Sequence, residues 1–224
     1  MTKWFTGALL VLFLLIGWGA GTPGAAAAVL INEVLADPDG DANRDGEVHS
    51  GRDEFVELVN IADSPISLAQ WSLSDLVRVR HVFSDSAAIP SYGFFVVFGG
   101  GAPQGFAHAA VASTGSLALN NAGDTITLRD ADTFFIDTLT YGREGGRNTS
   151  LTRSPDATGP FALHAAVNGF AFSPGTTLDG STRLPGPPNL PLTDPAGGPV
   201  VPEPSSFALV SLGLLGLPLI RRRK

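Results

Sequence analysis

The chain has 224 residues, no cysteine, a hydrophobic fraction of 44% and a formal net charge of −7. This length allows one sizeable domain with extensions, and the lack of cysteine excludes disulfides and thiol catalysis. Residues 29–203 hold nine arginines, no lysine and all 21 acidic residues, a net charge of −12. A surface with this excess of negative charge disfavours nucleic acid and anionic lipid as partners and favours cations.

The first 28 residues have the order of a secretory signal peptide. Lys3 precedes an apolar run over residues 5–16 and a small-residue stretch over 19–28. Ala26 and Ala28 fit the cleavage rule of signal peptidase, so the mature chain is expected to begin at Val29. An uncleaved N-terminal anchor is the alternative.

Residues 29–180 alternate short apolar runs with turn-forming clusters, and no helical pattern competes. Runs rich in Val, Ile, Phe and Thr are typical of strands; they cover residues 29–35, 54–59, 94–98, 125–128 and 134–141. Gly, Pro, Asp, Asn and Ser gather between them. This pattern predicts an all-β fold, an antiparallel β-sandwich.

Two of these runs make finer predictions. In residues 124–128 the alternation places Thr125 and Thr127 outward and Ile126 and Leu128 inward. In residues 134–141 the alternation changes phase at Asp137. Either the strand contains a bulge, or Asp137 is buried and hydrogen-bonded.

The segment between the first two runs resembles the calcium loops of EF-hand and dockerin proteins. Asp41, Asn43 and Asp45 occupy positions 1, 3 and 5, and Gly46 falls at the sharp turn of position 6. In this register Glu47 offers its backbone carbonyl, and Val48 is expected to pin the loop to the body of the protein.

The twelfth position of this loop departs from the pattern, because it holds Arg52 in place of a bidentate glutamate. Asp53 or Glu54, or Asp37 and Asp39, would have to complete the ligand shell. Residues 37–54 contain seven acids and two arginines, a crowding that a bound cation would relieve. The candidate calcium site is therefore Asp41, Asn43, Asp45, Glu47 and Asp53, and the alternative is a solvated, disordered loop.

Other polar and aromatic residues are expected to have structural roles. Trp71 is predicted in the core, and the four histidines lack metal-ligand spacing and are expected in solvent or turns. The glycine run 99–101 is interpreted as a flexible loop. Glu54 and Glu57 could suggest a glycosidase acid–base pair, but a strand places them on opposite faces.

The last 44 residues change character twice. Residues 181–200 are rich in Pro and Gly, as in an extended linker. Residues 201–224 then contain Pro202, Glu203 and Pro204, an apolar run over 207–220, and a basic cluster of Arg221, Arg222, Arg223 and Lys224. A basic cluster beside a short apolar span stays on the cytoplasmic side. The span of about 14 residues, a helix of roughly 21 Å, falls short of the ~30 Å hydrocarbon core.

This tail resembles the PEP-CTERM sorting signal, which implies processing by an exosortase in a Gram-negative bacterium. A plain C-terminal anchor is the alternative. The resemblance implies a precursor anchored in the inner membrane, and then a protein at the cell surface or in the extracellular matrix.

The body resembles a lamin-tail domain, an Ig-like β-sandwich found in lamins and in exported bacterial proteins. The resemblance rests on separated motifs: Ile31-Asn32-Glu33-Val34, Asp53-Glu54-Phe55-Val56-Glu57, Trp71-Ser72-Leu73-Ser74-Asp75, Asn120-Asn121-Ala122-Gly123-Asp124 and Asp137-Thr138-Leu139-Thr140-Tyr141-Gly142. Two later segments, Ser150 to Asp156 and Phe172 to Gly175, resemble the closing part of the bacterial members. Thr133 replaces a turn glycine common in the family.

The lamin-tail resemblance implies binding or scaffolding and brings no catalytic residues. The expected function is therefore that of a non-enzymatic surface or exopolysaccharide-matrix (biofilm) protein, whose partner is a polysaccharide or a surface protein. The alternative is a secreted hydrolase, a glycosidase or phosphoesterase with carboxylates on the sandwich.

Overall fold

Short β-strands make up nearly all the regular structure of residues 28–186, the part of the chain that the computed structural model describes. In chain order the strands are β1 (Val29–Leu35), β2 (Phe55–Asn60), β3 (Ile66–Ser67), β4 (Ser72–Ser74), β5 (Val79–Val82), β6 (Ala88–Ile89), β7 (Phe94–Phe98), β8 (Ala109–Val111), β9 (Asp124–Arg129), β10 (Phe135–Tyr141), β11 (Leu151–Arg153) and β12 (Phe161–Leu163). Two short helical segments, η2 (Arg143–Gly145) and α1 (His164–Asn168), complete the fold.

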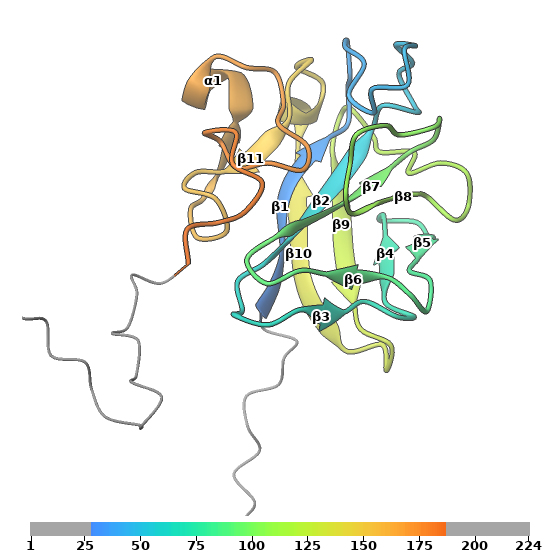
Figure 1. Ribbon diagram of the computed structural model, residues 1–224. Coiled ribbons are helices and arrows are strands. Elements are labelled where there is room, and N and C mark those ends of the chain that lie inside the picture. Colours follow the sequence, from blue (N-terminus) through green and yellow to red (C-terminus); the bar gives the residue numbers. More distant parts are fainter. Residues whose placement is uncertain (1–27, 187–224) are drawn as a thin grey trace, which may run out of the picture. The chain divides into compact units, whose positions relative to one another are not determined.

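The strands form two stacked sheets and a small ribbon (Figure 1). The six-stranded sheet has the order β12-β11-β1-β2-β7-β8, and the four-stranded sheet the order β10-β9-β4-β5. Strands β3 and β6 form a separate two-stranded ribbon, whose Ile66 and Ile89 belong to the main core. All pairs are antiparallel except β7 with β8. The predicted all-β antiparallel sandwich is confirmed, with one parallel pair that the sequence pattern did not predict.

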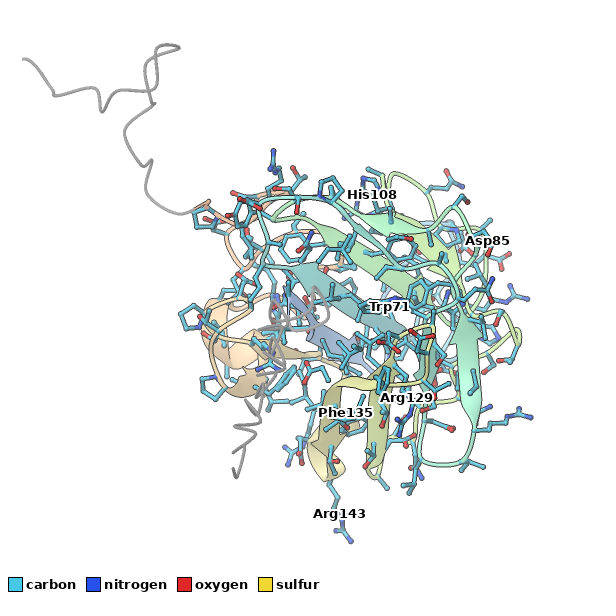
Figure 2. The ribbon with its side chains drawn as sticks, turned by 90° about the horizontal axis from the view of Figure 1, so that it is seen from below. Trp71, Asp85, His108, Arg129, Phe135 and Arg143 are labelled. Atoms are coloured by element: carbon cyan, nitrogen blue, oxygen red, sulfur yellow. The ribbon has the colours of Figure 1, made fainter. Side chains whose placement is uncertain are left out.

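The main core lies between the two sheets. Val56, Leu58 and Val97 of the larger sheet and Ile126 and Leu128 of the smaller one belong to one buried cluster. In β9 the inward Ile126 and Leu128 alternate with less buried neighbours, as the two-residue period of strands requires. Trp71, only 7% exposed, joins this cluster, as Figure 2 shows, and so its predicted core role is confirmed.

The outer face of the six-stranded sheet is also buried. Every residue of β2 and of β7 is buried, which a sheet with one face in water cannot achieve. The C-terminal segment covers this face: Phe172 packs with Leu35, Phe55, Val96 and Phe98, and Leu184 packs with Val59, Phe94 and Ala157. We call residues 170–184 the strap.

The strap extends the folded body beyond the boundary expected at Gly180. Leu184 donates its backbone N–H to the carbonyl of Tyr92 at 2.7 Å, and the compact unit ends at this residue. The predicted signal peptide, most of the linker and the sorting tail lie outside the described residues. No helix within residues 28–186 is both long enough and apolar enough to cross a bilayer.

Strand β10 contains the predicted bulge, and Asp137 is hydrogen-bonded as in the other alternative but only half-buried. The pairing with β9 shifts register between Phe135 and Asp137, as at a bulge. Asp137 also accepts the backbone N–H of Ile31 at 2.9 Å and pairs with Arg153 at 3.3 Å. Before β10, Thr133 has a φ of 68°, so the turn keeps a left-handed geometry in which glycine is the favoured residue.

Candidate functional site

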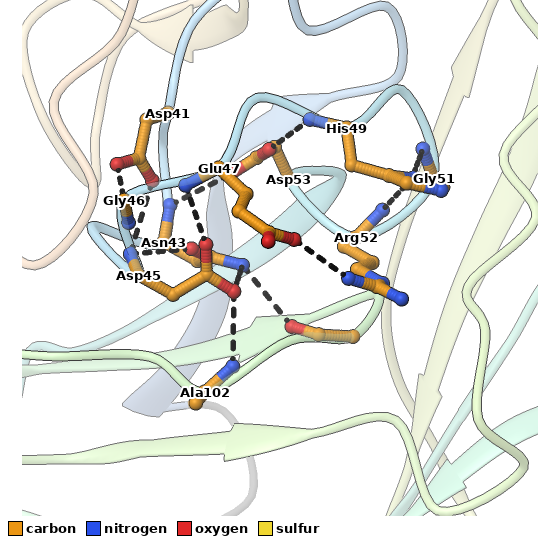
Figure 3. A network of polar contacts seen from close by, with 11 residues as sticks. Asp41, Asn43, Asp45, Gly46, Glu47, His49, Gly51, Arg52, Asp53 and Ala102 are labelled. Atoms are coloured by element: carbon orange, nitrogen blue, oxygen red, sulfur yellow. Dashed lines mark hydrogen bonds and ion pairs between the residues drawn. The ribbon is translucent and has the colours of Figure 1, made fainter.

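The acidic loop (residues 37–54) joins β1 to β2, and its side chains fold back onto its own backbone (Figure 3). Asp41 accepts the N–H groups of Asp45 and Gly46 at 3.1 and 2.9 Å. Asn43 Oδ1 accepts the N–H of Asp45 at 2.9 Å, and Asp45 Oδ1 accepts that of Glu47 at 3.0 Å. The side-chain oxygens at positions 1, 3 and 5 therefore all turn toward the inside of the loop.

Further bonds fix the acidic loop to the body. The fully buried Asp53 carboxylate accepts the N–H groups of Asn43 and His49, at 3.0 and 2.7 Å. Asn43 Nδ2 donates to the carbonyl of Gly100 at 3.2 Å, and Asp45 Oδ2 accepts the N–H of Ala102 at 3.1 Å. The loop is folded against the segment after β7, and the disordered alternative is wrong.

The glycine run 99–101 lies under the acidic loop and permits this close packing. A β-carbon on Gly101 would collide with the carboxylate of Asp45, and one on Gly99 would collide with the carbonyl of Gly51. Gly101 also has a φ of +78°. The run was interpreted as a flexible loop, but its glycines are explained by the approach of a second backbone.

The five candidate calcium ligands do not all occupy equivalent places. Asp41, Asn43 and Asp45 converge, whereas Asp53 is turned inward and the exposed Glu47 side chain pairs with Arg52 at 3.2 Å. Hydrogen bonds from Ala102 and Glu47 lower the pKa of Asp45, which favours the charged form that a cation requires.

The residues predicted to support the calcium loop have other positions and contacts in the structure. Val48 is 61% exposed and so does not pin the loop. Glu54 accepts the N–H of Leu119 at 3.3 Å, and Asp37 accepts from the side chain of Asn121 at 2.7 Å, so neither completes the shell. No cluster of three or more His, Asp or Glu side chains within residues 28–186 has a metal-binding arrangement. Calcium binding remains a prediction.

A second group of carboxylates lies buried beneath the strap. Glu33 of β1 and Glu57 of β2 are paired directly across the two strands, and both are fully buried. Glu33 Oε1 accepts the Ser150 hydroxyl at 2.6 Å and the Ser173 N–H at 2.9 Å, while Oε2 accepts the Ser173 hydroxyl at 2.9 Å. Glu57 accepts Asn32 Nδ2 at 2.9 Å and the Gly175 N–H at 2.6 Å. We call Glu33 and Glu57 the buried glutamate pair.

Burial dominates the electrostatics of this pair. Removal from water raises the pKa of Glu33, an effect that the nearby His164 opposes. Burial and the adjacent charge of Glu33 raise the pKa of Glu57 well above its ordinary value. Carboxylates so enclosed are stable only with hydrogen-bond donors on every side. The strap supplies those of Ser173 and Gly175, and Ser150 and Asn32 supply the others.

His164 completes the network, but it does not form a hydrolytic triad. Its Nδ1 lies 2.9 Å from the carbonyl of Phe170, which can only accept, so Nδ1 carries a hydrogen. Its Nε2 lies 2.8 Å from the hydroxyl of Ser173. In a catalytic triad the carboxylate accepts a hydrogen bond from the imidazole. Here Glu33 instead accepts hydrogen bonds from the N–H and O–H of Ser173, and these bonds hold the strap in place.

Two of the four histidines contradict the sequence prediction. His164 is fully buried, and His81 is only 4% exposed. His81 accepts the Ser113 N–H at Nδ1, at 3.1 Å, and burial lowers its pKa to about 4. Both rings are thus internal, while His49 and His108 are exposed as expected.

Glu54 and Glu57 have separate surroundings, in keeping with the opposite strand faces expected for them. Glu54 faces Leu119, Arg80 and Asp124, and burial raises its pKa to about 7. Near it, the buried hydroxyl of Tyr141 has no hydrogen-bond partner among residues 28–186, and burial raises the pKa of that hydroxyl. The alternative that places a hydrolase on these carboxylates gains no support.

The buried glutamate pair is the feature that sequence analysis missed. Its partners come from positions as far as 140 residues apart, and no spacing rule connects them. The available signal was Asn32-Glu33 inside the apolar run of β1, together with Glu57 inside that of β2. The sorting residues Pro202, Glu203, Pro204 and Arg221, Arg222, Arg223 lie outside the described residues.

Comparison with known families identifies both parts of the chain. The Lamin Tail Domain model matches residues 22–143, and the model of the PEP-CTERM protein-sorting motif matches residues 200–224. The second match marks the chain as an exported protein with a membrane-anchored precursor and an exosortase as its processing enzyme. A search of curated proteins finds no match. Since the first match covers more than half of the sequence, the chain belongs to the lamin tail domain family.

Proposed function

We propose that this is a non-catalytic cell-surface or matrix protein, which an exosortase processes and which presents its sandwich as a binding or scaffold module. The sorting motif at the end of a folded, self-contained sandwich carries the proposal. The buried polar side chains of the body also support the proposal of a non-catalytic module. Their hydrogen bonds hold the strap in place; these residues are Glu33, Glu57, Ser173 and His164.

We also propose that calcium stabilises the acidic loop. The side chains of Asp41, Asn43 and Asp45, with the carbonyl of Glu47, would hold the ion by hard oxygen donors. These three side chains already converge within one folded loop. Bound calcium would fix the connection between β1 and β2 in a chain that has no cysteine.

Mass spectrometry of the protein in the envelope and medium fractions of an exosortase-bearing host tests the proposed function. The expected mass begins at Val29 and ends near Pro202 to Pro204, and deletion of the exosortase restores the full tail. A full-length tail retained in the inner membrane with the exosortase present would contradict the proposal. A variant lacking residues 221–224 is the matched control for recognition of the basic cluster.

A further inference from the structure

Three polar side chains at the strap lie in one line of hydrogen bonds. The Ser173 hydroxyl of the strap lies 2.9 Å from Oε2 of Glu33 on β1 and 2.8 Å from Nε2 of His164 on α1. Glu33 and His164 are fully buried, so the serine hydroxyl bridges a carboxylate and an imidazole inside the protein. We call these three residues the strap latch.

The geometry fixes the number of hydrogens in the strap latch. Nδ1 of His164 carries one hydrogen, because its partner is the carbonyl of Phe170. The two contacts of the Ser173 hydroxyl require one hydrogen each, and a hydroxyl supplies only one. The second hydrogen lies on Nε2 of His164, or on Oε2 of Glu33 when the hydroxyl turns toward the imidazole. In both arrangements the latch holds one proton more than an ionised carboxylate and a neutral imidazole would hold.

Loss of this proton leaves one contact of the strap latch without a hydrogen. The Ser173 oxygen would then face a carboxylate oxygen or an imidazole nitrogen with lone pairs on both sides. A buried acceptor that loses its donor is destabilised, because no water replaces the missing hydrogen bond. When the strap is open, the same groups bond to water, so deprotonation penalises only the closed state.

The charges around the strap latch favour retention of the proton. Glu57 of β2 lies opposite Glu33, and Asp156 of the β11–β12 loop shares the side-chain amide of Asn32 with Glu57. Burial raises the pKa of Glu33, and burial together with the charge of Glu33 raises that of Glu57. The ion pairs of residues 28–186 include neither glutamate, so no arginine there compensates a further negative charge.

We propose that the strap latch is a pH-sensitive switch, in which the closed strap holds one proton between Glu33 and His164 and opens when a rise in pH removes it. Opening would uncover the outer face of the six-stranded sheet, where Phe172 of the strap packs with Phe55 and Phe98.

The direction of the pH dependence follows from the number of protons in each state. In water an imidazole is neutral above about pH 6.5 and a carboxyl is ionised above about pH 4.3. Above about pH 6.5 the closed strap therefore binds one proton more than the open strap. The equilibrium constant for opening should rise up to tenfold per pH unit from there, until the closed state also loses the proton.

Hydrogen exchange of the exported protein, followed by mass spectrometry of its peptides from pH 6 to 9, tests the switch. Dividing each rate by the intrinsic rate at the same pH leaves the opening equilibrium. We expect the protection of residues 170–184, which include the bonded N–H groups of Ser173 and Gly175, to fall about tenfold per pH unit above pH 6.5. The protection of β7 should fall less, because the paired strands remain closed.

Glu33→Gln is the decisive variant, because it imitates the protonated carboxyl. Its oxygen still accepts from Ser150 and from the Ser173 N–H, and its amide donates to the Ser173 hydroxyl, which then donates to His164. The strap should stay closed, and the slope of protection against pH should decrease by one proton. Glu144→Gln, which alters an exposed acid of η2, is the matched control and should keep the native slope.

The proton can also be observed directly in the native protein. Nuclear magnetic resonance of the ¹⁵N-labelled imidazole and the ¹³C-labelled carboxyl at pH 8 should show hydrogens on both nitrogens of His164, or a protonated Glu33. A closed strap with one imidazole hydrogen and an ionised Glu33 would overturn the proposal. So would a strap protection independent of pH, an equal loss of protection in β7, or a native slope in Glu33→Gln.

Discussion

The acidic loop and the buried glutamate pair are two carboxylate-rich regions with opposite solutions to the same electrostatic problem. In the loop, Asp41 and Asp45 are only partly buried, and hydrogen bonds from the N–H groups of Ala102 and Glu47 lower the pKa of Asp45. In the pair, acids lie under the strap and accept bonds from distant segments, and both acquire a raised pKa. A local cluster can therefore hold its charge, whereas the pair is stable only because the rest of the chain closes over it.

The largest expected effect comes from removing one member of the buried glutamate pair. Glu33→Ala leaves the donors of Ser150 and Ser173 unpaired in the interior, and we expect a loss of about 3–5 kcal/mol of unfolding free energy, the range for breaking a buried charged network. Urea denaturation measures it. Glu47→Ala, which removes an exposed ion pair of the acidic loop, is the control and should change stability by less than about 1 kcal/mol. Equal losses of unfolding free energy in Glu33→Ala and Glu47→Ala would contradict the difference drawn between the two regions.

Glu54, the last residue of the acidic loop, gives a pH dependence of known sign. Its folded pKa of about 7 exceeds the ordinary 4.5, so its contribution is fully present below pH 4.5 and is lost as the pH rises through 7. At about 1.4 kcal/mol per pKa unit, the loss is of the order of 3 kcal/mol. Urea midpoints measured from pH 4.5 to 8 should fall in the native protein.

Glu54→Gln isolates this contribution, because glutamine keeps an acceptor for Leu119 and cannot ionise. The variant should show a flatter profile over the same range. The remaining slope would come from Glu33 and Glu57, whose raised pKa values act in the same direction. An unchanged slope in the variant would show that Glu54 does not titrate there.

Calcium should affect the acidic loop alone. At a concentration 100 times the dissociation constant, binding stabilises the folded state by about 2.7 kcal/mol, seen as a higher calorimetric melting temperature that chelator reverses. Asp41→Asn retains an acceptor for Gly46 while removing a charge, and should abolish the increase. Asp63→Asn, in an exposed turn, should retain it. No shift in the native protein would refute the calcium proposal.

The smallest expected effect lies outside both regions, at the turn before β10. Thr133 has a φ of 68°, where a β-branched residue is strained, and Thr133→Gly should raise the unfolding free energy by about 0.5–1 kcal/mol after the entropic disadvantage of glycine. Chemical denaturation measures the gain, and Thr127→Gly within β9 should instead lower stability. Destabilisation by Thr133→Gly would show that its side chain makes contacts that outweigh the strain.

The elements predictable from the sequence are those whose signal is local. β1 and β7 have the predicted bounds, and β2 and β9 differ by one residue at their ends, because strand alternation is a property of neighbouring residues. The acidic loop was located for the same reason. Sequence analysis could not predict that His81 and His164 are buried, or that Ser173 donates hydrogen bonds to Glu33. Each of these features depends on segments that only the completed fold brings together.

The attachment of Leu184 has a mechanical consequence. If processing leaves the protein tethered through its C-terminal end, a pulling force enters the sandwich at the Leu184–Tyr92 bond and then passes along the strap. The hydrogen bond of Gly175 to Glu57, and after it that of Ser173 to Glu33, would then bear the force one at a time. The strap would detach and lengthen under tension before the paired strands β1, β2 and β7 bear load. This lengthening would limit the force that reaches the sandwich.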